Sequence, residues 1–497
     1  MLQNLHRPQK VGLDLRIQPW SIIAAFLSIA VYSHAQKPNI LFIGVDDLRP
    51  ALGCYGDSQA ITPHLDKLAE RGTVFTRAYC QVASCHPSRT SILTGLRVKT
   101  SGVRRNGDGS FRRKMPGHVT LPQHFKEAGW FTQAFGKVFH VQDPVSWSAP
   151  KFLPQTRFGF PIYGKPETQN FQKSVRVTPK PKEWWGYKDG RNDKWAKAVS
   201  WEDPDVPDET LFDGQVATAV IGALRKQHEQ PFFLAPGFFR PHLPFVAPKK
   251  YFDRFPPGSL VLPENRRPSS QTPRFTHYNS AESRSYTDIS RSGGIPESKQ
   301  QELLRGYYAS VSYVDAQIGR ILEELDKLGL EKNTIVVVWS DHGYHFGEHG
   351  TWNKYTNFEE ATRSTLIVAA PGQKKPGSLA KGVVEMLDLY PTLCELAGLT
   401  VPESLDGQSF ANLLEQPCLP GKPVAFSQSS PRGVLGQSMR TPRYRYTRWT
   451  KGGEVVAEEL YDHGADPQEM ENLAGEVGEA GALERLRLEF DDRSGRL

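Results

Sequence analysis

The chain has 497 residues, of which 38% are hydrophobic and 23% are charged, and its formal net charge is +7. These values are typical of a soluble globular protein, and the length suits one large domain with a smaller one or two or three ordinary domains. No repeat at a fixed period supports a solenoid or a propeller. The positive charge favours an anionic partner. No zinc finger, RNA-binding signature or basic amphipathic helix accompanies it, so we expect no nucleic acid partner. A solvated basic surface and a sulfated polyanion both stay open as explanations of the charge.

The N-terminus has the features of a secretory signal. Basic residues precede a short apolar run at 20–32, and residues 33–35 read Ser-His-Ala, with small residues where a signal peptidase cuts. The run is shorter than the ~20 residues that a membrane span needs, which disfavours the alternative of an uncleaved anchor. We therefore predict a signal peptide at residues 1–35, export to the periplasm, the medium or a lysosome-like compartment, and no membrane segment after cleavage.

The first element of the mature chain is a continuous apolar run at Asn39–Val45, which predicts a strand buried on both faces, as in a parallel sheet. Asp46 and Asp47 follow directly at its carboxyl end. A helical pattern at 63–71 and a short strand at 73–75 come next.

The same order returns late in the chain. Apolar residues at helical spacing predict a long helix at 303–328, and a second apolar run predicts a buried strand at 334–339, followed by Asp341 and His342. Helix followed by buried strand, more than once, indicates an α/β fold with a large, mostly parallel central sheet flanked by helices. Ligands of such sheets bind beyond the carboxyl ends of the strands, so we expect the two acidic segments to share one site.

Two stretches, 144–210 and 255–300, are rich in Pro, Gly and Ser, and we expect them to be long loops that frame a cleft. After residue 420 the pattern changes: residues 437–441 and 444–449 alternate like antiparallel strands. The sequence therefore predicts a catalytic domain at 36–420 and a smaller C-terminal α+β subdomain with an antiparallel sheet at 421–497.

Residues 85–89 read Cys-His-Pro-Ser-Arg, and Leu-Thr-Gly follows at 93–95. A cysteine in front of a helix would have a lowered pKa and an anion site beside it. A tyrosine-phosphatase loop separates its cysteine and arginine by five residues, whereas three separate Cys85 from Arg89. A papain-like site needs different flanks, and a buried inert cysteine is the remaining alternative.

The chain has five cysteines, Cys54, Cys80, Cys85, Cys394 and Cys418. An odd number in an exported protein indicates one unpaired thiol. If Cys85 is that thiol, the other four allow three disulfide pairings, and the sequence does not choose between them.

The segment at 85–95 matches the signature of the type I sulfatases of the alkaline-phosphatase superfamily, and the chain resembles their iduronate-2-sulfatase branch. Further matching segments lie at 45–57, 136–140, 240–245, 340–355 and 440–462, so the resemblance covers nearly the whole mature chain. It implies that a separate maturation enzyme oxidises Cys85 to formylglycine, whose hydrate attacks sulfur and then releases sulfate by re-forming the aldehyde. It also implies a sulfated carbohydrate substrate, with a 2-O-sulfated uronic acid as one candidate.

The resemblance further implies one Ca²⁺ per subunit, held by Asp46, Asp47, Cys85, Asp341 and His342. Carboxylates suit Ca²⁺, while imidazole suits it poorly. The catalytic residues implied in addition to Cys85 are Arg89, which orients the nucleophile, Lys137, which bridges it to sulfate, His140, which accepts a proton, and His242 and Lys354, which bind sulfate and protonate the leaving alcohol.

Two alternatives keep this fold. One is a hydrolase of phosphonate or phosphate monoesters, and the other is an inactive glycan-binding homologue with unmodified Cys85. The signature also has His86 where many relatives carry a small residue, but that position varies, so we expect maturation to proceed. His345 and His349 are further candidates for substrate contact.

Overall fold

The computed structural model describes residues 37–154, 163–174, 198–227, 230–269, 271–276, 280 and 282–495. From Lys37 onward the chain forms one compact unit. The predicted signal peptide lies outside the described residues. Among the helices of the described ranges, none is long and apolar enough to cross a membrane.

The core of the protein is a seven-stranded sheet in the order β10-β2-β9-β8-β1-β6-β4. Six strands run parallel and β9 runs antiparallel to both of its neighbours, which confirms the predicted mostly parallel sheet. The strands are β1 Asn39–Val45, β2 Thr73–Phe75, β4 Phe131–Gly136, β6 Phe232–Phe238, β8 Thr334–Ser340, β9 Leu366–Ala369 and β10 Ser378–Ala380.

Strands β1 and β8 are paired in register over their whole length, from Asn39↔Thr334 to Val45↔Ser340. The residues that follow them therefore leave the sheet side by side. This register is the reason why Asp46 and Asp341 reach the same site although they are far apart in sequence.

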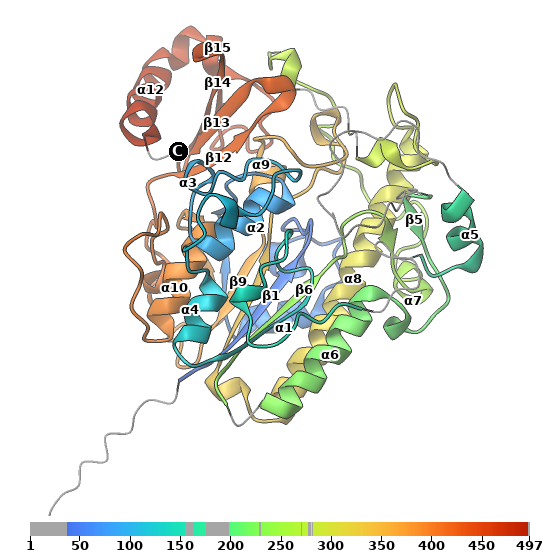
Figure 1. The fold of residues 1–497 in the computed structure, drawn as a ribbon. Coiled ribbons are helices and arrows are strands. Elements are labelled where there is room, and N and C mark those ends of the chain that lie inside the picture. The colour runs from blue at the N-terminus through green and yellow to red at the C-terminus, as the bar shows by residue number, and fades with distance from the viewer. Residues whose placement is uncertain are drawn as a thin grey trace, which may run out of the picture. The chain divides into compact units, whose positions relative to one another are not determined.

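Helices cover both faces of the sheet (Figure 1). One layer contains α1 Pro63–Glu70, α6 Phe212–Gln227 and α8 Glu297–Lys327, and the other contains α2 Cys85–Thr94, α4 Leu121–Glu127 and α10 Leu389–Leu396. Strand β1 serves both layers, because Leu41 and Ile43 pack into one core and Ile40 and Phe42 into the other. Helix α8 begins six residues before its predicted start, since its first turns are polar and carry no apolar periodicity.

A four-stranded antiparallel sheet follows near the C-terminus in the order β12-β13-β14-β15, as predicted. Helix α12 packs on it through Leu486 and Phe490, which share a core with Tyr446 and Leu460. The elements are β12 Ala425–Ser429, β13 Leu435–Arg440, β14 Tyr444–Lys451, β15 Glu454–Asp462 and α12 Ala480–Ser494. The domain boundary at 420/421 stays a prediction.

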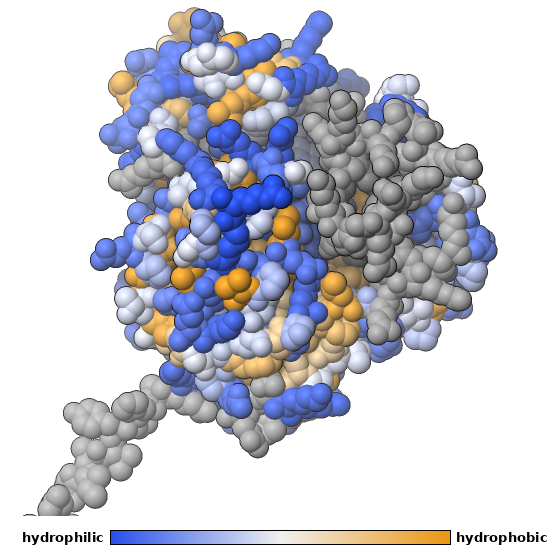
Figure 2. Space-filling view, in the orientation of Figure 1, coloured by the Kyte–Doolittle hydropathy of each residue, from blue (hydrophilic) through white to orange (hydrophobic). Residues whose placement is uncertain are grey.

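The expected long loops contain short elements in their described parts: α5 Pro166–Ser174, β5 Trp201–Glu202 and the first turn of α8. The remaining helices and strands are α3 Val98–Ser101, α7 Lys249–Phe252, α9 Glu359–Thr362, α11 Ala411–Glu415, β3 Ala78–Tyr79, β7 Phe245–Val246 and β11 Val384–Glu385. Figure 2 shows hydrophilic side chains interspersed with small hydrophobic patches on one face of the molecule.

The structure pairs none of the five cysteines in a disulfide. Cys80, Cys85 and Cys394 are buried, whereas Cys418 is exposed. The expectation that four cysteines pair is therefore wrong for this fold.

Candidate active site

The two acidic segments meet at the carboxyl ends of β1 and β8. The backbone N–H of Asp47 donates to Asp341 Oδ1 at 3.1 Å, and the carboxylates of both residues are buried. Asp47 has a φ of 59°, a left-handed conformation that a non-glycine residue adopts only when its surroundings hold it. Tyr307 supplies such a contact, because its hydroxyl donates to the carbonyl of Asp47 at 2.7 Å.

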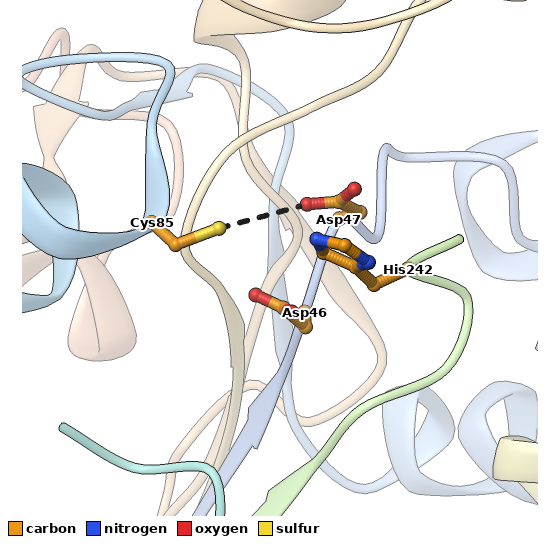
Figure 3. Close-up of side chains that lie close together, drawn as sticks. All are labelled: Asp46, Asp47, Cys85 and His242. Carbon is orange, nitrogen blue, oxygen red and sulfur yellow. Dashed lines mark hydrogen bonds between the residues drawn. The ribbon is translucent and has the colours of Figure 1, made fainter. Parts of the chain in front are cut away.

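Cys85 is the first residue of α2, and its sulfur points at the carboxylate of Asp47 (Figure 3). Its Sγ lies 3.5 Å from His342 Nε2 and 3.9 Å from Asp47 Oδ1. The side chain of Asn106 fixes this end of the helix, since its Oδ1 accepts from the backbone N–H of His86 and from the hydroxyl of Ser84, each at 2.9 Å. No motif or pattern around Asn106 indicates this role.

The thiol of Cys85 does not have the lowered pKa that its position before a helix predicted. Burial and the charge of Asp46 raise its pKa well above the usual value, and Lys137 and Lys354 do not offset them. Unmodified Cys85 is therefore a protonated thiol and a poor nucleophile, unlike the low-pKa cysteines of thiol-dependent enzymes.

Arg89 lies one turn after Cys85 and is fully buried. Its Nε donates to Asp341 Oδ2 at 2.8 Å and its Nη2 to Asp46 Oδ1 at 3.0 Å. Its Nη1 donates to the carbonyls of Lys137 and Val138 at 2.6 and 3.0 Å. The guanidinium thus ties together both acidic segments and the loop after β4.

Two lysines bring further positive charge to the carboxylates. The ammonium of Lys137 pairs with Asp46 Oδ2, and that of Lys354 lies 2.7 Å from both oxygens of Asp47. Burial raises the pKa of Asp46, but Lys137 and Arg89 outweigh it and hold that pKa below its usual value. Burial raises the pKa of Asp47 well above its usual value in spite of Lys354.

The remaining predicted residues, His242 and His140, come from the loops after β6 and β4. A ring nitrogen of His242 lies within 4.8 Å of Cys85 Sγ and of oxygens of Asp46 and Asp47 (Figure 3). His140 stacks on His86, with ring centroids 5.1 Å apart. Burial lowers the pKa of both His140 and His242 well below the usual value.

His345 and His349 were further candidates for substrate contact. His345 Nε2 lies 2.8 Å from Thr356 Oγ1, and His349 stacks on Phe358 with ring centroids 3.8 Å apart. Both imidazoles are buried and pack against other residues of the connection between β8 and β9, which also carries Lys354.

A divalent cation fits the centre of this cluster. His342 Nδ1 faces the carbonyl of Gly343 at 2.9 Å and donates to it, so Nε2 presents its lone pair to Asp47 Oδ1 at 3.5 Å and Asp341 Oδ1 at 3.7 Å. Burial lowers the pKa of His342, which keeps the imidazole neutral. A lone pair that faces two carboxylates is repulsive unless a cation lies between them, and the oxygens are ligands that Ca²⁺ prefers.

Sequence reasoning missed Glu282, which lies in one of the expected loops. Its Oε1 is 3.2 Å from His242 Nε2 and its Oε2 is 3.3 Å from Lys354 Nζ. A small pocket lies between the loop after β8 and the C-terminal sheet, and Tyr355, Trp449 and Tyr461 are among the residues that line it. The C-terminal sheet therefore contacts the loop that carries Lys354.

Comparison with known proteins agrees with this geometry. A family model described as Sulfatase matches residues 38–399, and one described as N-sulphoglucosamine sulphohydrolase, C-terminal, matches residues 347–494. Iduronate 2-sulfatase of Mus musculus is 34% identical over 562 residues, covering 94% of this chain and 97% of that protein. Delta 4,5-hexuronate-2-O-sulfatase of Bacteroides thetaiotaomicron is 28% identical, covering 92% and 89%. The solved structure of a phosphonate monoester hydrolase of Agrobacterium radiobacter has a TM-score of 0.73 at 22% identity, covering 93% and 96%, which reflects a shared alkaline-phosphatase-like fold.

Proposed function

The chain belongs to the sulfatase family, whose members hydrolyse sulfuric esters, and we propose that it removes sulfate from a 2-O-sulfated uronic acid of a glycan. The observation that carries the proposal is the convergence of Arg89, Lys137 and Lys354 on the carboxylates around Cys85, at the end of the sheet where α/β proteins bind ligands. Support for the sugar comes from relatives named for iduronate and hexuronate 2-O-sulfates.

We propose that a separate maturation enzyme converts Cys85 to formylglycine. The hydrate of this aldehyde would supply the hydroxyl nucleophile that a protonated Cys85 thiol lacks. A calcium ion held by Asp46, Asp47, Asp341, His342 and the modified Cys85 would supply fixed positive charge.

The other residues of the site would stabilise negative charge and transfer protons. Sulfate ester cleavage develops negative charge on the leaving oxygen, and Lys137 and Lys354 provide preorganised cations beside Cys85. Arg89 holds Asp46 and Asp341 in fixed positions. The leaving alcohol needs a proton, which His242 and Lys354 can supply, and His140 would accept the proton that the nucleophile releases.

A polyanionic glycan also fits the rim of the site. Arg104 and Arg105 are exposed and directly precede Asn106, which contacts the start of α2. Cations at the rim attract a sulfated chain and raise its local concentration.

We propose that export, directed by residues 1–35, brings the protein to such glycans, and that residues 36–420 form the catalytic domain.

The second candidate is a phosphonate or phosphate monoesterase, which the shared fold with the phosphonate monoester hydrolase supports. Phosphate and sulfate esters place similar demands on cations at the site, so the substrate must be tested directly.

The decisive experiment combines two measurements on the exported protein. Mass spectrometry of the peptide that contains Cys85 is expected to find formylglycine, and incubation with a panel of sulfated disaccharides and polysaccharides is expected to release sulfate from 2-O-sulfated uronates. An unmodified thiol without any sulfate release would refute the proposal and favour an inactive glycan-binding protein. Faster hydrolysis of 4-nitrophenyl phosphate or a phosphonate ester than of every sulfate would favour the second candidate.

A further inference from the structure

The side chain of Asn106 joins the start of α2 to the loop after β8. Its Oδ1 accepts from the Ser84 hydroxyl and from the backbone N–H of His86, each at 2.9 Å, and these two residues flank Cys85. A backbone N–H only donates, which fixes the orientation of the amide and turns its Nδ2 outward as a donor. This Nδ2 donates to the hydroxyl of Tyr355 at 3.2 Å. One amide therefore links two segments that are far apart in the chain.

A second hydrogen bond joins the same two segments. The backbone N–H of Tyr355 donates to the carbonyl of Ala83 at 3.1 Å, two positions before Cys85. Tyr355 has a φ of 74°, a left-handed conformation that a non-glycine residue keeps only where its surroundings hold it. Ala83 holds Tyr355 by its backbone and Asn106 holds it by its hydroxyl. Tyr355 directly follows Lys354, so these bonds also restrain the backbone of that lysine.

Cys85 and Lys354 meet at one carboxylate. Cys85 Sγ lies 3.9 Å from Asp47 Oδ1, and the ammonium of Lys354 lies 2.7 Å from the same oxygen. The nucleophile and the cation thus come from separate segments, and the contacts of Asn106 and Tyr355 fix how these segments lie relative to each other. A shift of about 1 Å between reacting groups can cost about 100-fold in rate.

The turn that carries Asn106 is stabilised by other contacts. The backbone N–H groups of Arg104 and Arg105 donate to Asp108 Oδ2 at 2.7 and 3.0 Å. These bonds close the turn around Asn106 and do not involve its side chain. The amide of Asn106 therefore serves the start of α2 and Tyr355, and not the turn itself.

We propose that Asn106 is a positioning residue that sets the separation between the nucleophile at Cys85 and the ammonium of Lys354, an inference that rests on the proposed sulfatase function. Asn106 acts through Tyr355, because the amide holds the hydroxyl of Tyr355 and the rest of that residue holds the backbone of Lys354. Attack on sulfur then starts from a fixed geometry, with the cation already in place beside the nucleophile. The bridge acts on the alignment of the two groups and hence on the chemical step more than on substrate affinity.

The test is a double-mutant cycle of Asn106→Ala and Tyr355→Phe, in which kcat is divided by the formylglycine content of each variant. We expect kcat for a 2-O-sulfated uronate disaccharide to fall about 30-fold in Asn106→Ala and about tenfold in Tyr355→Phe, since each removes one end of the bridge. The double variant should also fall about 30-fold, because the second replacement meets a bridge that is already broken. KM should stay within about threefold in all three variants.

Asn472→Ala is the matched control, because Asn472 makes the same pattern of contacts in the C-terminal part of the chain. Its Oδ1 accepts from the backbone N–H groups of Leu460 and Ala474 at 2.9 and 3.1 Å, and its Nδ2 donates to the carbonyl of Glu458 at 3.3 Å. Its replacement should lower the Tm and leave kcat unchanged. A loss of kcat as large as that in Asn106→Ala would mean that Asn106 acts through stability alone, and would overturn the proposal.

Three other outcomes would also overturn the proposal. They are losses that multiply to about 300-fold in the double variant, an unchanged kcat in Asn106→Ala, and a loss confined to KM, which would identify Asn106 as a substrate contact instead. If Asn106→Ala does not fold, Tyr355→Phe decides: a loss of about tenfold in kcat at unchanged KM supports the bridge, and an unchanged kcat overturns it. A wild-type protein that releases no sulfate would refute the sulfatase function itself.

Discussion

The ammonium of Lys354 lies 2.7 Å from both carboxylate oxygens of Asp47, a residue 307 positions earlier in the chain. Both side chains are buried, with 0% and 1% exposed. Burial disfavours each charge alone, but Asp47 holds the pKa of Lys354 well above its usual value. The pair therefore joins the end of β1 to the loop after β8 and keeps a cation beside Cys85.

Replacement of Lys354 by Met should damage both activity and stability. Asp47 would lose a buried counter-charge, which costs about 3–5 kcal/mol in comparable ion pairs, and the leaving oxygen would lose a cation. We expect kcat to fall at least about 100-fold and the midpoint of urea unfolding to decrease. Lys374→Met, at a lysine whose side chain is 74% exposed, is the control. Full activity in Lys354→Met would exclude a catalytic role for this ammonium.

Replacement of Cys85 by Ser tests the nucleophile. A serine has one hydroxyl and cannot re-form an aldehyde to expel sulfate, so steady-state turnover should fall at least about 10³-fold. Cys80→Ser is the matched control, because Cys80 is equally buried and makes a long hydrogen bond to the carbonyl of Ala361 at 4.0 Å. Normal turnover in Cys85→Ser would refute the formylglycine proposal. Loss of activity only in Cys80→Ser would indicate that Cys80, not Cys85, supplies the nucleophile.

Much of the fold follows from the local sequence. Strands β1 and β8 lie at their predicted positions because each is a continuous apolar run, and the parallel sheet then brings Asp46 and Asp341 together. Strands β13 and β14 follow from alternation around the turn at Thr441. A continuous apolar run indicates a strand buried on both faces, and alternation indicates a strand buried on one face. Both patterns can be read from the local sequence.

The parts of the site that the sequence did not reveal depend on tertiary contacts. Glu282 lies in a segment without periodicity, and nothing in its neighbours indicates that it meets Lys354. The pKa of Cys85 is raised because α2 packs its first residue against Asp46, which overrides the effect of a helix N-terminus. The disulfide expectation failed for the same reason, since cysteine counting carries no information on distance.

Chelation of the metal should abolish activity and lower thermal stability. Asp46, Asp47 and Asp341 crowd their charges at one point, so a bound cation stabilises the folded state over the unfolded state. At free Ca²⁺ 100-fold above its Kd the gain is about 2.7 kcal/mol. Differential scanning calorimetry in the presence of EGTA, and again after Ca²⁺ or Mg²⁺ is added back, measures this change in thermal stability. A Tm that does not change on chelation would contradict a site within this cluster, and recovery with Mg²⁺ alone would contradict calcium.

Replacement of both Arg104 and Arg105 by Ala should weaken binding of a polymer more than that of a small ester. Both residues are exposed and precede Asn106, which contacts the start of α2. An exposed ionic contact is worth ~0.2–1 kcal/mol, so we expect KM for a sulfated polysaccharide to rise about fivefold. KM for 4-nitrophenyl sulfate should stay unchanged, and the polymer effect should shrink at high salt. Lys327→Ala with Lys332→Ala removes the same charge near the amino end of β8 and is the control. Equal effects of the two double variants would indicate net charge rather than a rim site.

Acid should loosen the attachment of the C-terminal sheet to the rest of the fold through Glu469. This buried carboxylate pairs with Arg445, which also reaches Glu359 at 2.6 Å. Burial raises the pKa of Glu469, but Arg445 and the hydrogen bond from His463 lower it to about 2, against an ordinary value of 4.5. A carboxyl whose folded-state pKa is depressed stabilises the fold above its unfolded pKa and loses that contribution as pH falls toward its folded pKa.

Urea unfolding should therefore require less denaturant at each step from pH 4.5 to pH 2. In Glu469→Gln the loss over this window should be shallower, and stability at pH 7 lower by about 3 kcal/mol because Arg445 is left partly unpaired. Glu454→Gln, at an exposed end of β15, should behave like the wild-type protein, and a Glu469→Gln profile that matches it would rule out this ion pair as a source of acid sensitivity.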